Sequence, residues 1–190
     1  MIQGSSFQLK AEKGENNQKL AGKILKKIHL PIKKPKNFLK NNFDADVKKV
    51  FEHRYLRDLL ELGGIKKIEF NVDWSEVFKL GWVFLHGDYW LEHIILSEKE
   101  NQPYVIDWDY STFGTPYQDF VTVQTSIIDI FNNGDDFWEG YGLIPDKNTI
   151  NEYVKLECLR YFSFIRPDMY LREPKDGFYH KQMAILKKII

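Results

Sequence analysis

The sequence predicts a predominantly helical α+β protein, because it combines long helical periodicities with one pair of short apolar runs. Between Gln18 and His29, and again between Asp44 and Leu62, apolar residues recur every three or four positions, as in an amphipathic helix. The runs Ile94–Ser97 and Tyr104–Trp108 have the length of strands. The polar linker Glu98–Pro103 between these runs predicts that they form a β-hairpin.

The remaining elements follow from capping and breaking residues. Residues 1–17 are polar and contain Gly4 and Gly14, so we expect an irregular or extended segment there. Pro31 ends the first helix, Gly63 ends the second, and the stretch 111–116 reads as a loop from its Gly and Pro content. Further helices are expected from Asp73 or Ser75 towards Leu80, from Tyr117 or Asp119 to Phe131, from Asp146 or Asn148 to about Ile165, and after Gly177.

The composition indicates a folded core and excludes several classes of protein. Apolar residues make up 43% of the chain and aromatic residues 15%, which is too much for a disordered protein. No apolar run approaches the roughly 20 residues of a membrane span, and the start does not resemble a signal peptide. The single cysteine, Cys158, rules out an internal disulfide framework and indicates a small buried side chain in a cytoplasmic protein.

Charge is distributed unevenly although the net charge is zero. Residues 1–67 contain 16 Lys and Arg against 7 Asp and Glu, whereas the remainder contains 11 against 20. This asymmetry is compatible with internal complementarity, with an anionic ligand, or simply with solvated lysine-rich helix faces. Because the basic region is poor in Tyr and Trp, we expect no nucleic-acid partner.

Acidic residues and histidines interrupt the apolar runs in the middle of the chain. The residues concerned are His86, Asp88, His93, Asp107 and Asp109. Burying an unpaired carboxylate is costly, so packing alone does not explain Asp88 and Asp107, which the hairpin would bring together. Carboxylates can hold Mg²⁺ near phosphates, or orient a hydroxyl and take its proton. Alternatively, Asp88 and Asp109 are turn or capping residues, and His86 is a core histidine.

The order and spacing of these residues resemble the aminoglycoside phosphotransferase and choline kinase family. The matching positions are His86-Gly87-Asp88, then position 93, then Ile106-Asp107-Trp108, then Gly114-x-Pro116-x-x-Asp119, with an earlier helix that ends in His29. The resemblance covers nearly the whole chain and implies a kinase-like carboxy-terminal lobe, with the hairpin carrying a metal-binding aspartate.

The resemblance also implies a role for each matching residue. Asp88 corresponds to the catalytic aspartate that orients and deprotonates the acceptor, and Asp107 to the aspartate that binds Mg²⁺ on the nucleotide phosphates. Asp119 would brace the catalytic loop and His86 would pack behind Asp88. Asp109 occupies a commonly acidic position, where it could contact substrate or simply lie on the surface.

Two departures from the family pattern stand out. His93 replaces the Asn that serves as the second metal ligand, and an imidazole suits Zn²⁺ or Mn²⁺ better than Mg²⁺. The sequence also has no glycine-rich phosphate loop. We therefore expect residues 1–17 to be a hinge-like segment and residues 18–190 to be the catalytic and substrate-binding lobe, with the amino-terminal nucleotide lobe absent; no nucleotide-binding residue is identified.

The resemblance thus predicts the catalytic and substrate-binding lobe of a cytoplasmic phosphotransferase that uses Mg²⁺ and ATP or GTP. Its acceptor would be a hydroxyl group of an aminoglycoside-, choline- or sugar-like compound, and the acidic remainder of the chain favours a cationic one. Alone the chain would be inactive or nearly so, and a separate chain is one source of the missing lobe. No membrane partner is expected.

Two other functions compete with this one. The first is a pseudoenzyme or binding module of the same fold, which His93 and the missing lobe motivate. The second is a metal-dependent hydrolase with His86, Asp88, His93 and Asp107 as ligands, although this spacing fits no standard zinc signature.

Overall fold

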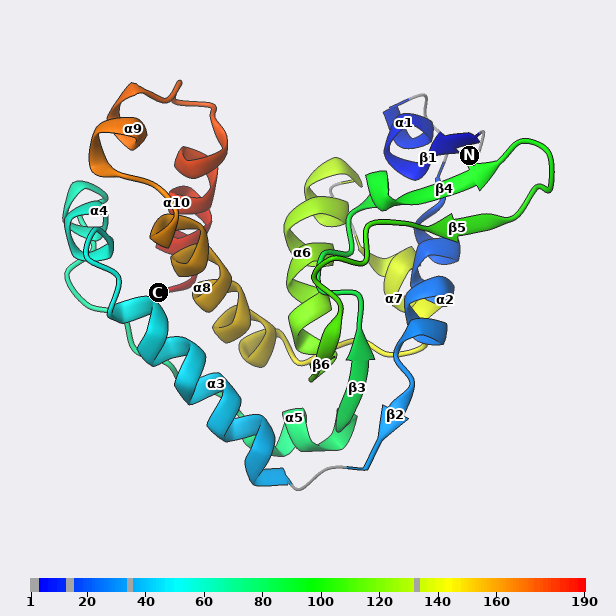
Figure 1. The fold of residues 1–190 in the computed structure, drawn as a ribbon, viewed down its shortest axis with the longest axis horizontal. Helices are drawn as coiled ribbons and strands as arrows, with labels where there is room; N and C mark the ends of the chain where they lie inside the picture. Colours follow the sequence, from blue (N-terminus) through cyan, green and yellow to red (C-terminus); the bar gives the residue numbers. More distant parts are fainter. Residues whose placement is uncertain (1–3, 13–15, 34–35, 132–133) are drawn as a thin grey trace. The chain divides into compact units, whose positions relative to one another are not determined.

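The computed structural model describes residues 4–12, 16–33, 36–131 and 134–190. The chain forms two units: the first spans Met1–Lys34 and Lys79–Pro145, and the second spans Pro35–Phe78 and Asp146–Ile190. Figure 1 shows the first unit with both small sheets and the second built from helices. The chain thus leaves unit 1, forms part of unit 2, and returns.

The first sheet of unit 1 contains the predicted hairpin. Its strands are β1 (Gly4–Ser6), β4 (Ile94–Ser97) and β5 (Pro103–Val105), all antiparallel in the order β1-β4-β5. Ile94 pairs with Val105, so the hairpin is confirmed. The prediction that its second strand continues to Trp108 is wrong. Asp107 adopts a left-handed backbone with φ of 61°, which ends the extended run.

The second sheet of unit 1 supports the loop that carries Asp88. It consists of β2 (Pro31–Ile32), β3 (Trp82–Leu85) and β6 (Thr112–Gly114), with β3 in the centre. The stretch 111–116, expected to be a loop, therefore contains a strand. Its backbone groups pair with β3, where Val83 faces Gly114 and Leu85 faces Thr112, and this long-range pairing overrides the local loop signal.

The helices of unit 1 are partly as predicted. α2 (Gln18–Ile28) and α6 (Tyr117–Phe131) match the expected spans, whereas α1 (Phe7–Glu12) and α7 (Asp135–Tyr141) were not predicted. The irregular segment expected at 1–17 is wrong at α1, because Phe7 is buried and Ser6 Oγ accepts a hydrogen bond from the backbone N–H of Leu9.

Two glycines let α2 and α7 pack closely. A Cβ atom on Gly22 would lie 2.1 Å from the Phe137 carbonyl oxygen, and one on Gly140 would lie 2.0 Å from the Lys19 carbonyl oxygen. Only the absence of a side chain permits this contact between the two helix backbones.

In its described residues, unit 2 contains helices and connecting segments but no strand. Its helices are α3 (Lys36–Phe51), α4 (Leu56–Leu62), α8 (Lys147–Ser163), α9 (Pro167–Arg172) and α10 (Phe178–Ile189), and α5 (Trp74–Leu80) lies at its boundary with unit 1. The predicted helices that end near Leu80, start near Asp146 and follow Gly177 are confirmed. Asp146 caps α8 by accepting a hydrogen bond from Thr149 N–H at 2.7 Å.

The single helix predicted between Asp44 and Leu62 is wrong. The structure has two helices there, α3 and α4, interrupted at residues 52–55, and α3 begins eight positions earlier, at Lys36. After the interruption α4 contacts both α8 and α9, while α3 contacts α8. Val50 in α3 and Leu59 in α4 are both buried, and α4 has α9 as a further neighbour. Periodicity alone does not reveal such a break.

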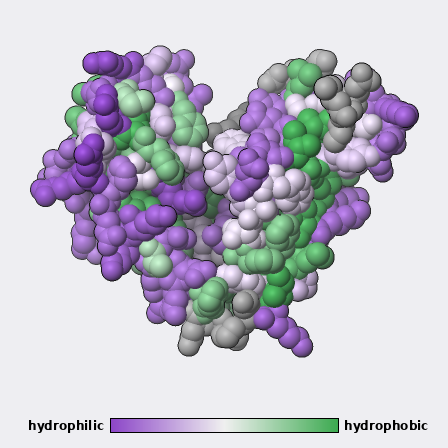
Figure 2. Space-filling view, viewed as in Figure 1, coloured by the Kyte–Doolittle hydropathy of each residue, from purple (hydrophilic) through white to green (hydrophobic). Residues whose placement is uncertain are grey.

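In the part of the chain that is described, no helix is long and apolar enough to cross a bilayer. On the face shown in Figure 2, hydrophilic residues cover most of unit 2, whereas unit 1 displays more hydrophobic residues. Cys158 is a free thiol and is buried, which confirms the prediction of a small buried side chain.

Candidate active site

The segment His86-Gly87-Asp88 forms a loop between β3 and a 3₁₀ turn at Leu91–His93. Gly87 has φ of 85°, a conformation that favours glycine. A Cβ atom on Gly87 would also lie 2.1 Å from the carbonyl oxygen of Tyr110. The backbone of the loop is therefore pressed against the segment that follows Asp107, which brings the two predicted acids into one region of unit 1.

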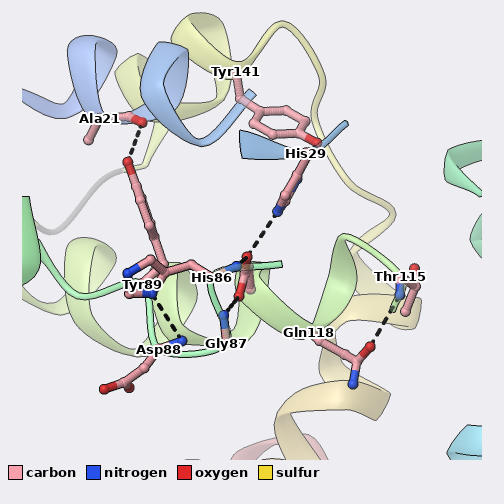
Figure 3. Close-up of polar contacts among 10 residues, drawn as sticks. Ala21, His29, His86, Gly87, Asp88, Tyr89, Thr115, Gln118 and Tyr141 are labelled. Carbon is pink, nitrogen blue, oxygen red and sulfur yellow. Dashed lines mark hydrogen bonds and ion pairs between the residues drawn. The ribbon is translucent and has the colours of Figure 1, made fainter. Parts of the chain in front are cut away.

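Asp119 lies behind this loop, in the first turn of α6, and is completely buried. Its Oδ2 accepts hydrogen bonds from the backbone N–H of His86 at 2.9 Å and from His29 Nε2 at 3.0 Å. Its Oδ1 accepts one from the Gly87 N–H at 2.8 Å (Figure 3). Three N–H donors thus satisfy the buried carboxylate and hold the backbone of the loop.

His29 links Asp119 to helix α7. Its Nδ1 lies 2.8 Å from the hydroxyl of Tyr141, so Tyr141 donates to Nδ1 while Nε2–H donates to Asp119 (Figure 3). Burial and the nearby negative charge of Asp119 raise the pKa of Tyr141, which keeps this hydroxyl protonated as the donor. Buried hydrogen bonds therefore link α7 through His29 and Asp119 to the backbone of the loop that carries Asp88.

The start of α6 is fixed by its own sequence. The side-chain oxygen of Gln118 accepts a hydrogen bond from Thr115 N–H at 3.1 Å, as in the return half of a capping box (Figure 3). This contact sets where the helix begins and so places Asp119 in its first turn.

His86 is buried, and both of its ring nitrogens are occupied. Nε2 donates to the carbonyl oxygen of Ile106 at 2.9 Å, and Nδ1 accepts from Asp88 N–H at 3.3 Å. The ring centroid lies 4.6 Å from that of Trp108. His86 therefore packs behind Asp88 and has no free nitrogen for a metal ion.

The carboxylate of Asp88 is held at one oxygen and is partly open to solvent. Oδ1 accepts a hydrogen bond from the indole N–H of Trp90, and 30% of the side chain is exposed. Just beyond it, the Tyr89 hydroxyl donates to the carbonyl oxygen of Ala21 at 2.8 Å, which anchors the loop to α2 (Figure 3). The sequence did not single out Trp90, because an aromatic two residues after an acid carries no distinctive spacing.

His93 lies between Asp88 and Asp107. Its Nδ1 is 2.8 Å from the backbone oxygen of Asp88 and 3.7 Å from the Oδ2 of the same residue. Its Nε2 is 3.6 Å from Asp107 Oδ2 and 3.9 Å from Glu92 Oε1. Asp107 is half-exposed, and Asp109 is exposed in the following turn. The structure thus brings Asp88, His93 and Asp107 together and leaves Asp109 at the surface.

The described residues include no group of three or more His, Cys, Asp or Glu side chains arranged to hold a metal ion. The four-ligand hydrolase alternative needs such a group and also a free His86, so the structure does not support it. Asp107 and His93 offer two donors. That number is sufficient where nucleotide phosphates and water supply the remaining ligands.

The model of the phosphotransferase enzyme family matches residues 19–152. A search of curated proteins gave no match.

Several solved structures share the fold. A choline/ethanolamine kinase family protein from Mesorhizobium loti is 14% identical with a TM-score of 0.53, covering 99% of this chain and 66% of that one. Spectinomycin phosphotransferase APH(9)-Ia, in complex with ADP and spectinomycin, is 17% identical with a TM-score of 0.50 and coverages of 99% and 65%. LicA in complex with AMP is 16% identical with a TM-score of 0.52 and coverages of 100% and 68%.

The chain spans about two-thirds of the length of these structures, and at such low identity the likeness concerns the fold. The family match extends over more than half of the chain and includes the loop with Asp88, the hairpin, and α6. The chain therefore belongs to the phosphotransferase enzyme family.

Proposed function

We propose that this chain provides the catalytic loop of an ATP-dependent phosphotransferase that acts on a hydroxyl group of a small molecule. The observation that carries the proposal is the environment of Asp88. Its carboxylate is partly exposed, and the loop that carries it donates two backbone hydrogen bonds to buried Asp119. Family membership supports the class of reaction, and the adenine nucleotides in two of the related structures support ATP as the donor.

Asp88 is proposed to act as the general base. Trp90 occupies its Oδ1, which leaves Oδ2 to accept the proton of an acceptor hydroxyl. The hydroxyl oxygen then forms the new bond to the γ-phosphorus while the bond to the ADP oxygen breaks. Because Asp119, His86 and Trp90 already hold the loop and the carboxylate, little reorganisation is needed at the moment of transfer.

Asp107 and His93 are the residues proposed to hold a divalent ion. Such an ion would neutralise charge on the nucleotide phosphates. The carboxylate of Asp107 is half-exposed and suits Mg²⁺, whereas the imidazole of His93 suits it less well. Asp109, exposed beyond them, is proposed only as a contact for substrate or as a surface residue.

The acceptor is proposed to carry a positive charge. Trp108, Tyr110 and Phe113 are exposed aromatic side chains on the segment that follows Asp107, and the Tyr110 backbone adjoins Gly87. Aromatic faces attract cations, and the acidic remainder of the chain adds long-range attraction. The structures of similar fold include a choline/ethanolamine kinase family protein and a spectinomycin phosphotransferase, which is compatible with such acceptors.

We further propose that these 190 residues turn over slowly by themselves. The sequence contains no glycine-rich loop and no strand lysine in the family pattern to bind the phosphates. Removing one charge-stabilising group already costs roughly 10²–10³ in rate, so a missing set should cost more.

The test is an assay for phosphorylated product with ATP and a panel of hydroxyl compounds, cationic and neutral. It is run with the chain alone and with the chain joined to the nucleotide-binding lobe of a related kinase. We expect ATP-dependent product in the joined form, with cationic hydroxyl compounds preferred. No product with any acceptor in the joined form would contradict the proposed reaction.

A pseudoenzyme of the same fold is the second candidate, and His93 is the observation that favours it. In that case the chain would bind partners without metal-dependent chemistry. Thermal unfolding with and without Mg²⁺-ATP separates the two: clear stabilisation by the complex supports the enzyme, and its absence in the joined form supports the pseudoenzyme.

A further inference from the structure

The tautomer of His93 is fixed by its surroundings. Nδ1 lies 2.8 Å from the backbone carbonyl oxygen of Asp88, and a carbonyl can only accept, so Nδ1 carries the hydrogen. In the neutral ring the lone pair is therefore on Nε2. The side chain is 13% exposed, so this nitrogen is held in place and is not free in solvent.

That nitrogen faces another electron-pair donor. Nε2 lies 3.6 Å from Asp107 Oδ2, with Glu92 Oε1 3.9 Å away. A nitrogen and an oxygen each bound at about 2.1 Å to one metal ion lie about 3.0 Å apart at a right angle and about 3.4 Å apart at the tetrahedral angle. The observed separation of 3.6 Å exceeds the tetrahedral value by about 0.2 Å and the right-angle value by about 0.6 Å, so a small side-chain rotation would let both atoms bind one ion.

A backbone hydrogen bond brings the two residues near one another. The N–H of Ile106, the residue before Asp107, donates to the carbonyl oxygen of His93 at 2.9 Å. His93 therefore pairs with Ile106 at the end of the β4–β5 hairpin, and Asp107, with a left-handed φ of 61°, is the next residue after this pair. The fold therefore brings these two residues together, and the rotamers of their side chains set the distance between Nε2 and Oδ2.

We infer that this site selects a first-row transition ion, Mn²⁺ in preference to Mg²⁺, through His93 Nε2 and the carboxylate of Asp107. Mg²⁺ prefers oxygen ligands and gives up water reluctantly, whereas an imidazole nitrogen binds ions of the Mn²⁺ to Zn²⁺ series. This inference rests on the proposed function only in assigning the ion to the nucleotide site; the ion preference itself is a property of two side chains.

The experiment measures ion binding and does not require turnover. Mn²⁺ is titrated into the full 190-residue chain, with and without a non-hydrolysable ATP analogue, and free Mn²⁺ is read from its electron paramagnetic resonance signal. Mg²⁺ affinity follows from competition. Echo modulation from a nitrogen nucleus in the bound Mn²⁺ spectrum would directly report imidazole coordination in the unaltered chain.

Three variants accompany it. In His93→Asn we expect the preference for Mn²⁺ over Mg²⁺ to fall about tenfold or more, because an amide oxygen replaces the nitrogen. In Asp107→Asn we expect both ions to bind more weakly, and Asn tolerates the left-handed backbone at that position. Glu98→Gln removes an exposed acid in the hairpin turn and should bind both ions as the unaltered chain does.

An unchanged ion preference in His93→Asn, or no nitrogen modulation in the unaltered chain, overturns the inference even if phosphoryl transfer is found. Conversely, retained Mn²⁺ preference without any phosphoryl transfer counts against the proposed function and leaves the inference standing. Thermal unfolding of each variant shows whether it is folded, and the nitrogen signal needs no variant at all.

Discussion

Asp119 shows how one buried acid organises a surface loop. Its two oxygens accept hydrogen bonds from His86 N–H, Gly87 N–H and His29 Nε2. The spacing of the family motif singled out Asp119. It did not predict the hydrogen bond between Asp119 and His29, which lies 90 residues earlier in the chain. Contacts of that kind depend on tertiary structure, and residue types or spacing do not reveal them.

Replacing Asp119 with Asn should destabilise the protein. The amide has one acceptor oxygen where the carboxylate has two, so at least one buried N–H is left unpaired, at a cost of about 1–3 kcal/mol. Urea unfolding should show a lower free energy of unfolding in this variant. Asp58→Asn, a change at an exposed position in α4, is the matched control and should stay within about 0.5 kcal/mol. Equal stability of the two variants would refute the role given to Asp119.

Cys158 is a second residue whose environment gives a testable pH dependence. Burial, followed by the charge of Glu157, raises its pKa from 9.0 to about 12. A thiol with a raised pKa in the folded state contributes stability below its unfolded value of 9.0, and this contribution is lost as the pH rises towards about 12.

The free energy of unfolding should therefore fall above pH 9 more steeply in the unaltered chain than in Cys158→Ala. The difference between the two slopes isolates the thiol from the tyrosines, whose pKa values are also raised by burial. The thiol should also resist labelling at pH 8 until the chain is unfolded. Rapid labelling of the native protein, or identical slopes, would be the contrary result.

At the scale of elements, the close contact between α2 and α7 supports the site from a distance. Tyr141, at the end of α7, forms a hydrogen bond with His29, which directly follows α2. His29 in turn forms a hydrogen bond with Asp119. Because the glycines let the two helices approach, Tyr141 reaches His29. The position of the loop that carries Asp88 therefore depends on how these helices pack.

Gly22→Ala should push the helices apart. The new Cβ atom would lie 2.1 Å from a backbone oxygen of α7, and backbone atoms yield little, so we expect a loss of about 1–3 kcal/mol in the free energy of unfolding. Lys23→Ala, at the next and exposed position, is the control and should change little. Chemical denaturation of both variants decides, and a Gly22→Ala protein as stable as the control would contradict the packing described.

Element prediction succeeded where one local signal dominated. α2, α6, α8, α10 and the β4–β5 hairpin were recognised from periodicity, caps and turn residues. It failed at α3 and α4, where one apolar stripe continued across a break, and at β6, whose short strand exists only because β3 supplies a partner. Short stretches of sequence do not predict long-range strand pairing or a change in helix direction.

At the scale of the whole molecule, two units arise because the chain leaves unit 1 after β2 and returns before β3. These two strands nevertheless pair, with Pro31 opposite Val83. The predicted site residues all belong to the part of unit 1 that spans Lys79–Pro145. The two segments of unit 2, Pro35–Phe78 and Asp146–Ile190, precede and follow this part in the sequence. The sequence motifs pointed to residues that all lie in unit 1, but gave no sign of this division.

The central claim is that Asp88 takes the proton of the acceptor. Asp88→Asn keeps the shape of the side chain and an oxygen for the Trp90 hydrogen bond, but removes the basic oxygen. The most direct measurement is the rate of phosphoryl transfer by the joined form with saturating ATP and its preferred acceptor, with Asp58→Asn as control. A fall of about 10²–10⁴ in kcat for Asp88→Asn alone is the predicted result; an unchanged kcat would contradict the claim.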